Sequence, residues 1–206
     1  MINTVMLSNV RINIEDENAP YRFSDVKVYA TLTASQLVIA NLVNNNYLSE
    51  LRYIDGSKTF SGGSFLLSGL TYSVLGGDEG IISVKANTGY FTKKLKMDEL
   101  GSLNNAYKTG NNKRPIMYVS NGSIYLYPTT ISLGDIHYYQ VPTAIDASTS
   151  CILNSILHNA VVTYASSTLL ASDNKLDRSL LFKKIVIDEL TLLNQKYEVK
   201  KIEEKT

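Results

Sequence analysis

The hydrophobic pattern is clearest near the end of the chain. From Ser148 to Tyr197, apolar residues recur at three- and four-residue spacings, which is typical of amphipathic helices. The polar run Ser172-Asp173-Asn174 interrupts this pattern and predicts a turn between two helices. The first helix has a wide apolar face made of two rows, Ile152, Ile156, Ala160, Tyr164 and Thr168 beside Leu153, Leu157, Val161, Ala165 and Leu169. We expect this face to be buried across its width.

The second of these helices is apolar on two sides. One flank consists of Leu176, Leu180, Ile187 and Thr191, and the other consists of Phe182, Ile185, Val186, Leu190, Leu193 and Tyr197. Charged residues lie between the flanks. A helix that is apolar nearly all round must be buried nearly all round, and the first helix can cover only one flank. A neighbouring copy of the chain and the central strands are the two alternatives for the other flank.

Residues 1–46 predict two further helices. Thr4 to Glu15 fits a helix, although alternation of apolar residues at its end also fits a strand. Ser24 is a suitable N-cap for a helix that runs to about Leu42, and Asp25 suits the positive end of its dipole. The predicted buried face of this helix contains Val28, Leu32, Ser35, Ile39 and Leu42.

Residues 47–145 predict a β-rich middle, because β-branched and aromatic residues alternate there between glycine and asparagine breaks. Strands are expected at 65–75, 81–86, 116–119, 123–127 and 135–141, and a short helix at 97–107. Asn121-Gly122 favours a two-residue type I′ turn, so the third and fourth of these strands should form a hairpin.

Together these elements predict an α+β fold in a single domain, 1–206. We expect an antiparallel helical bundle, with two N-terminal helices in 1–46 and two long C-terminal helices in 146–197, and with 47–145 as a β-rich central insertion. Residues 198–206 are a charged tail, which is either a solvated end or an arm that becomes ordered on a partner.

Composition and charge narrow the function. The chain is 44% hydrophobic and 19% charged, which is ordinary for a globular protein. Its net charge of +1 argues against a nucleic-acid binder, because neutralising phosphates requires a basic excess. Cys151, the only cysteine, is expected to be a small core residue. We see no signal peptide and no apolar run of the roughly 18 residues that a membrane span needs, so we expect synthesis in a cytoplasm.

Residues that resemble active-site signals do not form a catalytic motif. Gly76-Gly77-Asp78-Glu79 is similar to the acidic hairpin of diguanylate cyclases, but Gly80 stands where those enzymes have an aromatic residue. We interpret the run as a loop whose glycines allow positive φ. His137 and His158 lack a metal-binding spacing and are expected to be structural, and Asp188-Glu189 is interpreted as a solvated helix face. The sequence predicts no enzyme and no cofactor.

Fourteen tyrosines and no tryptophan give the chain many amphipathic rings. Five lie on the predicted central strands, namely Tyr118, Tyr125, Tyr127, Tyr138 and Tyr139. Tyrosine is common on half-buried surfaces such as protein interfaces. These rings either pack within the sheet or form a platform for sugars, and the low net charge weakens a third use, stacking on bases.

Five segments follow one another in a recognisable order. Arg22-Phe23-Ser24-Asp25 opens an early helix, Tyr118 to Pro128 corresponds to the pattern y-x-x-G-x-I-x-L-x-P with one extra residue before Gly122, and Tyr138 to Pro142 has the form Y-x-x-x-P. His158 to Ala165 then corresponds to the pattern h-x-x-[VI]-x-x-A with one extra residue before Ala165, and Ser172-Asp173-Asn174 precedes the last helix. In this order the chain resembles the head-to-tail connector proteins of tailed bacteriophages, although the spacings are slightly irregular.

The resemblance covers most of the chain but not its β-rich part. The stretch from about Tyr47 to Ala86 is longer than in the smallest helical connectors, which leaves the position in the phage neck open. A composition rich in asparagine, isoleucine, lysine and tyrosine suits an AT-rich phage. The ring proteins of crAss-like short-tailed phages are one group that the chain is similar to.

The resemblance implies a non-enzymatic virion protein of the neck. Such a protein forms a ring, expected to be a dodecamer, beneath the portal protein, contacts other neck and tail ring proteins, and lets genomic DNA pass without sequence-specific binding. It needs neither a cofactor nor a membrane. We expect subunit contacts at Ile187, Leu192 and Tyr197 and portal contacts at Lys200, Lys201 and Glu203. The alternatives are a tyrosine-rich carbohydrate- or surface-binding module of a phage tail and an enzyme that gathers His137 or His158 with carboxylates.

Overall fold

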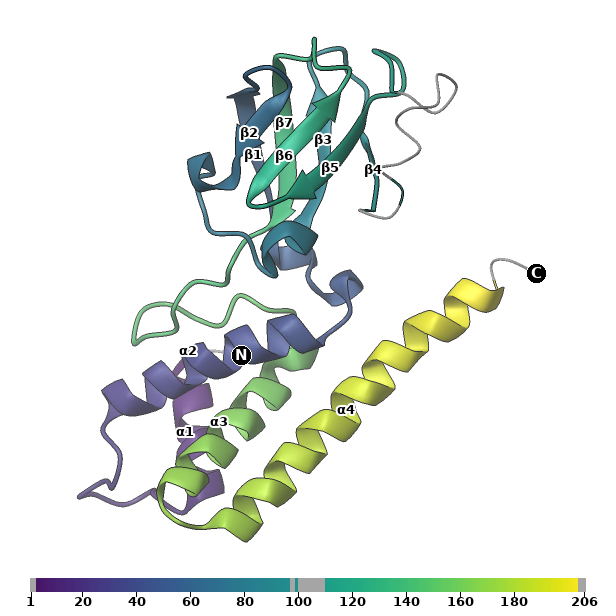
Figure 1. Ribbon diagram of the computed structural model, residues 1–206. Helices are drawn as coiled ribbons and strands as arrows, with labels where there is room; N and C mark the ends of the chain where they lie inside the picture. Colours follow the sequence, from purple (N-terminus) through teal and green to yellow (C-terminus); the bar gives the residue numbers. More distant parts are fainter. Residues whose placement is uncertain (1–2, 97–98, 100–109, 204–206) are drawn as a thin grey trace. The chain divides into compact units, whose positions relative to one another are not determined.

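The computed structural model describes residues 3–96, 99 and 110–203, and for 197–203 it describes the backbone. The predicted α+β class is confirmed, because the described part contains four α-helices and two sheets (Figure 1). The helices are α1 Asn3–Ile14, α2 Asp25–Leu42, α3 His158–Ser172 and α4 Leu176–Glu203. The chain forms two compact units, a helical unit of Met1–Glu50 with Pro142–Thr206 and a β unit of Leu51–Val141.

Helix α3 is the centre of the helical unit, since α1, α2 and α4 all pack against it. Its row Val161, Ala165 and Leu169 is at most 1% exposed, as the hydrophobic pattern predicts, but the expected burial across the whole face is wrong, because Ile156 is 46% exposed and Thr168 is also exposed. The predicted start near Ile152 is wrong, because α3 begins at His158 after a short 3₁₀ turn. Asn154 caps that turn by accepting a hydrogen bond from the Ile156 backbone N–H, which ends the extended segment before it.

Both N-terminal helices follow their local signals. α1 starts and ends one residue before the predicted range, and Ser24 caps α2 by accepting a hydrogen bond from the Lys27 backbone N–H. The expected burial of Leu42 is wrong, because this side chain is 50% exposed and Val43, one residue later, is buried in its place. Leu42 is the last helical residue and Val43 is already extended, so their side chains point in different directions. Helical spacing therefore places the buried contact one residue too early.

An extended segment, 142–152, is fastened along α2 by polar side chains. Gln36 is fully buried, donates to the Thr143 carbonyl oxygen at 2.8 Å and accepts from the Ile152 backbone N–H at 3.0 Å. One turn earlier, the Thr33 hydroxyl accepts from the Ile145 backbone N–H at 2.9 Å. These side chains take the place of the partners that a strand would find in a sheet.

A buried ion pair closes the loop between α1 and α2. Arg11 and Asp16 are 6% and 4% exposed, and the Arg11 Nη1 to Asp16 Oδ2 distance is 2.9 Å. The other guanidinium nitrogen donates to the Phe23 carbonyl oxygen at 3.1 Å and to the Asp25 carboxylate. The Tyr21 ring lies against the guanidinium at 3.7 Å. Each buried charge therefore has both a counter-charge and hydrogen-bond partners.

The β unit consists of two sheets around one core. The first sheet has the antiparallel order β1 (Arg52–Thr59), β7 (Leu133–Tyr139), β3 (Ile81–Ala86), and the second has the order β2 (Ser64–Leu66), β6 (Ser123–Tyr127), β5 (Ile116–Ser120), β4 (Lys93–Lys94). Both sheets contribute to a single buried cluster that includes Ile136 and Tyr138 from β7 with Met117 and Ile124 from β5 and β6. The predicted strand 81–86 is β3.

The hairpin prediction is also confirmed. β5 and β6 pair antiparallel, and both turn residues have positive φ, 51° at Asn121 and 69° at Gly122. Strand β7 begins and ends two residues before the predicted 135–141. The predicted helix at 97–107 lies outside the described residues, apart from Glu99.

The predicted strand 65–75 is wrong beyond its first residues. β2 ends at Leu66, and a 3₁₀ turn follows. Side chains satisfy the next backbone groups, because the Thr71 N–H donates to the Asp55 carboxylate at 2.7 Å and the Tyr72 N–H donates to the Tyr138 hydroxyl at 3.1 Å. The end of the segment then pairs with the chain after β7 as an isolated bridge, because Leu75 and Val141 donate backbone hydrogen bonds to Tyr139 and Ser73.

Candidate interaction surfaces

Helix α4 carries the largest set of exposed apolar side chains in the described part of the helical unit. Its residues Val186, Leu190 and Leu193 are at most 6% exposed and form the stripe that packs against α3. The remaining large aliphatic side chains, Leu176, Leu180, Leu181, Ile185, Ile187 and Leu192, are between 47% and 64% exposed. Exposed apolar patches of this kind mark interaction sites.

These exposed side chains lie on two sides of the buried stripe. At about 100° per residue, Leu176, Leu180, Ile187 and Thr191 form one side, here the Leu180 flank, while Leu181, Ile185 and Leu192 form the other, here the Leu192 flank. The sequence pattern placed Ile185 beside Val186 on a common flank, but Ile185 is 47% exposed and Val186 is buried. α4 therefore has three apolar stripes rather than two.

The expected subunit contacts do not form one patch. Ile187 and Leu192 are 57% and 62% exposed, as a contact residue of a free subunit should be. They are five residues apart and so about 140° apart around the helix, which places them on different flanks. The third expected contact, Tyr197, has a side chain outside the described part.

The expected portal contacts lie on the last turns of α4. Its backbone stays helical to Glu203, six residues past the predicted end at Tyr197, because lysine and glutamate are good helix formers. The side chains of Lys200, Lys201 and Glu203 lie outside the described residues.

A groove runs between the first turns of α2 and the extended segment that is fastened to it. This α2 groove has a volume of about 690 Å³ and is lined by Asp25, Val26, Tyr29, Ala30, Thr33, Ala144, Ile145, Asp146 and Ala147. Val26 is 79% exposed at its mouth. Its lining is mostly small and apolar, with two carboxylates as the ionisable groups.

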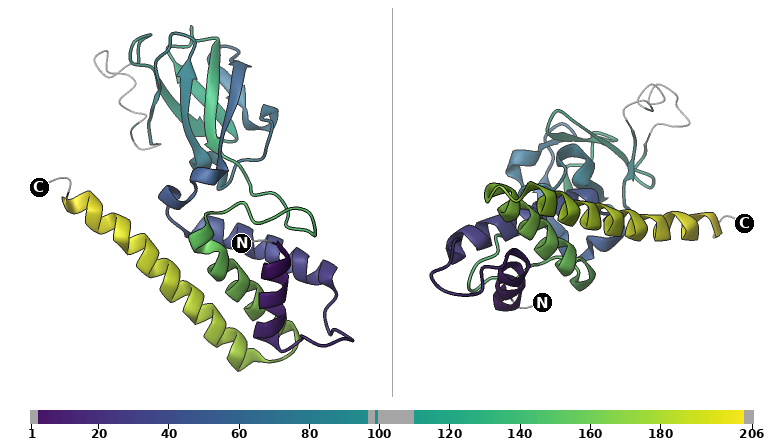
Figure 2. Two further views of the ribbon diagram at one scale, coloured as in Figure 1. Left: turned by 180° about the vertical axis from the view of Figure 1, so that it is seen from behind. Right: turned by 90° about the horizontal axis from the view of Figure 1, so that it is seen from below.

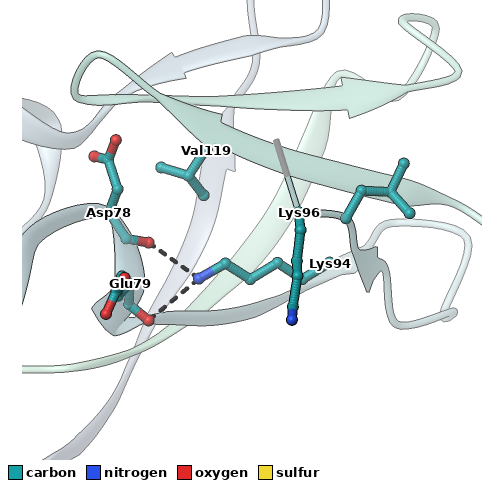
Figure 3. Close-up of a pocket in the computed structure, with 6 residues that line it drawn as sticks. Asp78, Glu79, Lys94, Lys96 and Val119 are labelled. Atoms are coloured by element: carbon teal, nitrogen blue, oxygen red, sulfur yellow. Dashed lines mark hydrogen bonds between the residues drawn. The ribbon is translucent and has the colours of Figure 1, made fainter. Parts of the chain in front are cut away.

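A second cavity, of about 680 Å³, lies in the β unit beside the glycine-rich loop (Figure 3). Gly76 and Gly77 have φ of 69° and 60°, as the loop interpretation predicts. The Lys94 ammonium donates to three backbone carbonyl oxygens, those of Asp78, Glu79 and Ile81, at 3.0, 3.2 and 2.8 Å. Burial lowers the pKa of Lys94, and the nearby carboxylates oppose that effect. Since all three ammonium hydrogens are used, Lys94 holds the loop in place and has no donor left for a ligand.

The two histidines belong to different elements, His158 to α3 and His137 to β7. His158 is buried, and its Nε2 lies 2.8 Å from the Leu153 carbonyl oxygen. His137 packs edge-on against the Phe91 ring at 5.3 Å. Burial lowers the pKa of both histidines and raises the pKa of the buried Cys151 thiol. Within the described ranges, no group of three or more metal-ligating side chains is gathered.

The acidic pair on α4 divides between two environments. Asp188 is exposed, as expected for a solvated face. The same expectation is wrong for Glu189, which is half-buried and lines a groove of about 400 Å³ with Asn9, Ile12 and Ile185. Burial raises the pKa of its carboxyl.

The tyrosines of the central strands also divide into two groups. Tyr138 and Tyr139 are both buried, and Tyr138 belongs to the core cluster of the β unit. Tyr118, Tyr125 and Tyr127 are half-buried on the other face of β5 and β6. Tyr118 stacks on Tyr125 at 4.7 Å and on Tyr127 at 6.2 Å, so the rings cover one another's faces.

Helix α4 and the α2 groove are therefore the strongest candidate surfaces, and both suit a protein partner better than a small substrate. None of the described helices is both long and apolar enough to cross a membrane. No protein-family model matches the chain, and no curated protein matches it.

Proposed function

We propose that the chain is a structural ring protein of a tailed-phage virion, located in the neck below the portal. It joins the capsid to the tail and extends the DNA channel. The observation that carries this proposal is the exposure of six large aliphatic side chains on α4. Burying each half-exposed side chain in a subunit contact would contribute about 1 kcal/mol to the free energy of association, and several such side chains together would stabilise the contact.

Two other features support the same proposal. The order of motifs from Arg22 to Asn174 resembles that of phage connectors, and a net charge of +1 suits a channel through which DNA must slide without adhering. In this proposal the four helices form an antiparallel bundle that serves as the body of the ring, expected to contain twelve copies. The β-rich residues 47–145 are an insertion that faces other neck or tail proteins, and no catalysis or cofactor is involved.

The proposal predicts a defined stoichiometry with the portal of the same phage. Mass photometry of the purified chain alone should show a monomer or a weak oligomer, because a ring contact gains most when a template holds neighbours together. With the portal, the chain should saturate at one copy per portal subunit. A chain that leaves the portal unoccupied at micromolar concentration would contradict the proposal.

Deleting 199–206 provides the matched variant for this experiment. The truncated chain should keep the thermal unfolding transition of the intact chain, since it retains the α3 to α4 packing, and should lose portal binding. Undiminished binding by the truncated chain would remove the tail from the portal contact and overturn the assignment.

A second candidate function is a carbohydrate-binding module of a phage tail. The half-buried stack of Tyr118, Tyr125 and Tyr127 is the observation that favours it. If this function is correct, the monomer binds on a glycan array, and Tyr125→Ala lowers that binding at least tenfold, about 1.4 kcal/mol. Tyr90→Ala is the control, because that exposed tyrosine of the β unit lies outside the stack. If no glycan on the array binds the monomer, the carbohydrate-binding function is wrong and the ring proposal is the one that stays.

A further inference from the structure

The α2 groove is built to keep its shape without a ligand. One wall is helix α2, and the other is the segment that Thr33 and Gln36 fasten to it by backbone hydrogen bonds. Asn3 secures the same segment from α1, donating to the carbonyl oxygens of Asp146 and Ala147 at 2.8 and 2.6 Å. A groove fixed in this way can bind a partner with little cost in ordering.

A local turn fixes the rim of the groove at its acidic end. One Asp146 carboxylate oxygen accepts from the Ser148 N–H at 2.7 Å, the Ser148 hydroxyl at 2.8 Å and the Thr149 N–H at 2.7 Å. These hydrogen bonds lower the pKa of Asp146 to about 2. The rim therefore carries a negative charge at every pH at which a neck protein works.

The Leu180 flank of α4 matches this groove in shape and charge. Its bulky Leu176, Leu180 and Ile187 form a ridge at spacings of one and two helical turns, while Ala30 and Ala144 leave room in the groove. Lys183 and Lys184 lie on either side of that ridge, by their helical spacing. The carboxylates that line the groove are those of Asp25, which is paired with Arg11, and Asp146. Lysines beside the ridge and the Asp146 carboxylate beside the groove favour this pairing over a pairing of two ridges.

The two surfaces also lie where a head-to-tail contact needs them. Figures 1 and 2 show α4 on one side of α3 and the first turns of α2, along which the extended segment 142–152 runs, on the other side. A heterologous contact joins two different patches of one subunit, and it generates a closed ring when the rotation between neighbours closes.

We infer that the Leu180 flank of one copy lies in the α2 groove of the next copy, and that this contact builds the ring. The inference rests on the proposed function and adds to it the two faces that meet. It assigns Leu180 and Ile187 to the subunit contact and leaves Leu192, on the other flank, outside it.

Engineered cysteines test this pairing. In a Cys151→Ala background, Leu180→Cys and Ala144→Cys are made as separate variants, mixed, and oxidised both free and on the portal. Contact should hold the two thiols at millimolar effective concentration, so the mixture should form a disulfide-linked dimer at least about tenfold faster than a control mixture of Leu181→Cys with Ala144→Cys. Combining Leu180→Cys and Ala144→Cys in one chain should produce a ladder of linked oligomers.

Each other outcome has a distinct meaning. If Leu180→Cys alone forms dimers as fast as the mixture, α4 pairs with itself by two-fold symmetry and the inference is wrong. If mass photometry shows a ring while the mixture stays unlinked, the ring proposal stands and the groove assignment fails. If the mixture stays unlinked and no oligomer forms with the portal, both are wrong.

Discussion

Replacing Arg11 with methionine is expected to lower the free energy of unfolding of the helical unit by about 3–5 kcal/mol. Arg11 is 6% exposed, and its guanidinium neutralises the equally buried Asp16 carboxylate at 2.9 Å. Methionine can fill the space of the aliphatic stem, but it removes the nearer counter-charge of Asp16, leaving the Arg22 guanidinium at 3.8 Å, and it leaves the Phe23 carbonyl oxygen without its guanidinium donor. Urea denaturation followed by helical circular dichroism measures the change, and the dependence on urea should remain that of the parent chain.

An exposed ion pair of the same helical unit supplies the control. The Lys175 ammonium lies 3.9 Å from the Glu15 carboxylate, and both side chains are at least one-third exposed. Lys175→Met should therefore cost less than about 1 kcal/mol. Replacing Arg11 and Asp16 together, by methionine and leucine, should recover part of the Arg11→Met loss, since no charge then stays buried. Equal losses for Arg11→Met and Lys175→Met would show that burial does not decide the cost.

Gly80→Ala should destabilise the β unit by more than the roughly 1–3 kcal/mol typical of overpacking. A Cβ atom at this position would lie 1.9 Å from the Leu75 carbonyl oxygen and 2.7 Å from a Val74 methyl carbon. The carbonyl belongs to the backbone, so it cannot move aside as a flexible side chain does. Relief would require shifting the start of β3, which Lys94 holds through the Ile81 carbonyl oxygen. Tyrosine fluorescence during urea unfolding, together with circular dichroism, follows this unit.

Gly56→Ala is the matched control within the β unit. A Cβ at this position would meet the Asp135 carboxylate at 3.7 Å, which is ordinary contact. Its effect on the free energy of unfolding should stay within about 0.5–1 kcal/mol, the usual scale for such glycine replacements. A Gly80→Ala variant as stable as Gly56→Ala would mean that the loop before β3 yields easily.

Features that depend on neighbours in the sequence could be predicted from it. The Ser24 cap, the Asn121-Gly122 hairpin turn and the turn at Asp173 each arise from backbone preferences of a few adjacent residues. Helical spacing also gave the buried row of α3. These signals are local, and tertiary contacts do not change them.

Features that depend on long-range hydrogen bonds could not be predicted. The stretch after β2 looked like a strand, but Asp55 and Tyr138 bind its backbone from other elements. Gln36 is the residue that could have indicated these bonds. A glutamine one turn after Leu32 on an apolar face must find polar partners when it is buried. Arg11 is a similar case, because an arginine next to the buried Val10 must find a counter-charge when it is itself buried.

The candidate surfaces were predictable only in part. The sequence indicates that α4 is apolar on several sides, and the exposure of Ile187 and Leu192 agrees with that. It could not indicate which stripe α3 covers, because this depends on how the two helices pack after the turn. It also could not reveal the α2 groove, whose second wall lies more than a hundred residues away along the chain.

The two ends of the β unit lie next to each other, which bears on how the gene can evolve. The Gln140 backbone N–H donates to the Leu51 carbonyl oxygen at 2.8 Å, and Arg52 is paired with Tyr139 directly beside it. A segment whose ends adjoin can be exchanged for another of different length with little loop-closure cost. A gene could thus acquire, lose or diversify the β unit as a cassette while it keeps the helices that surround the insertion point.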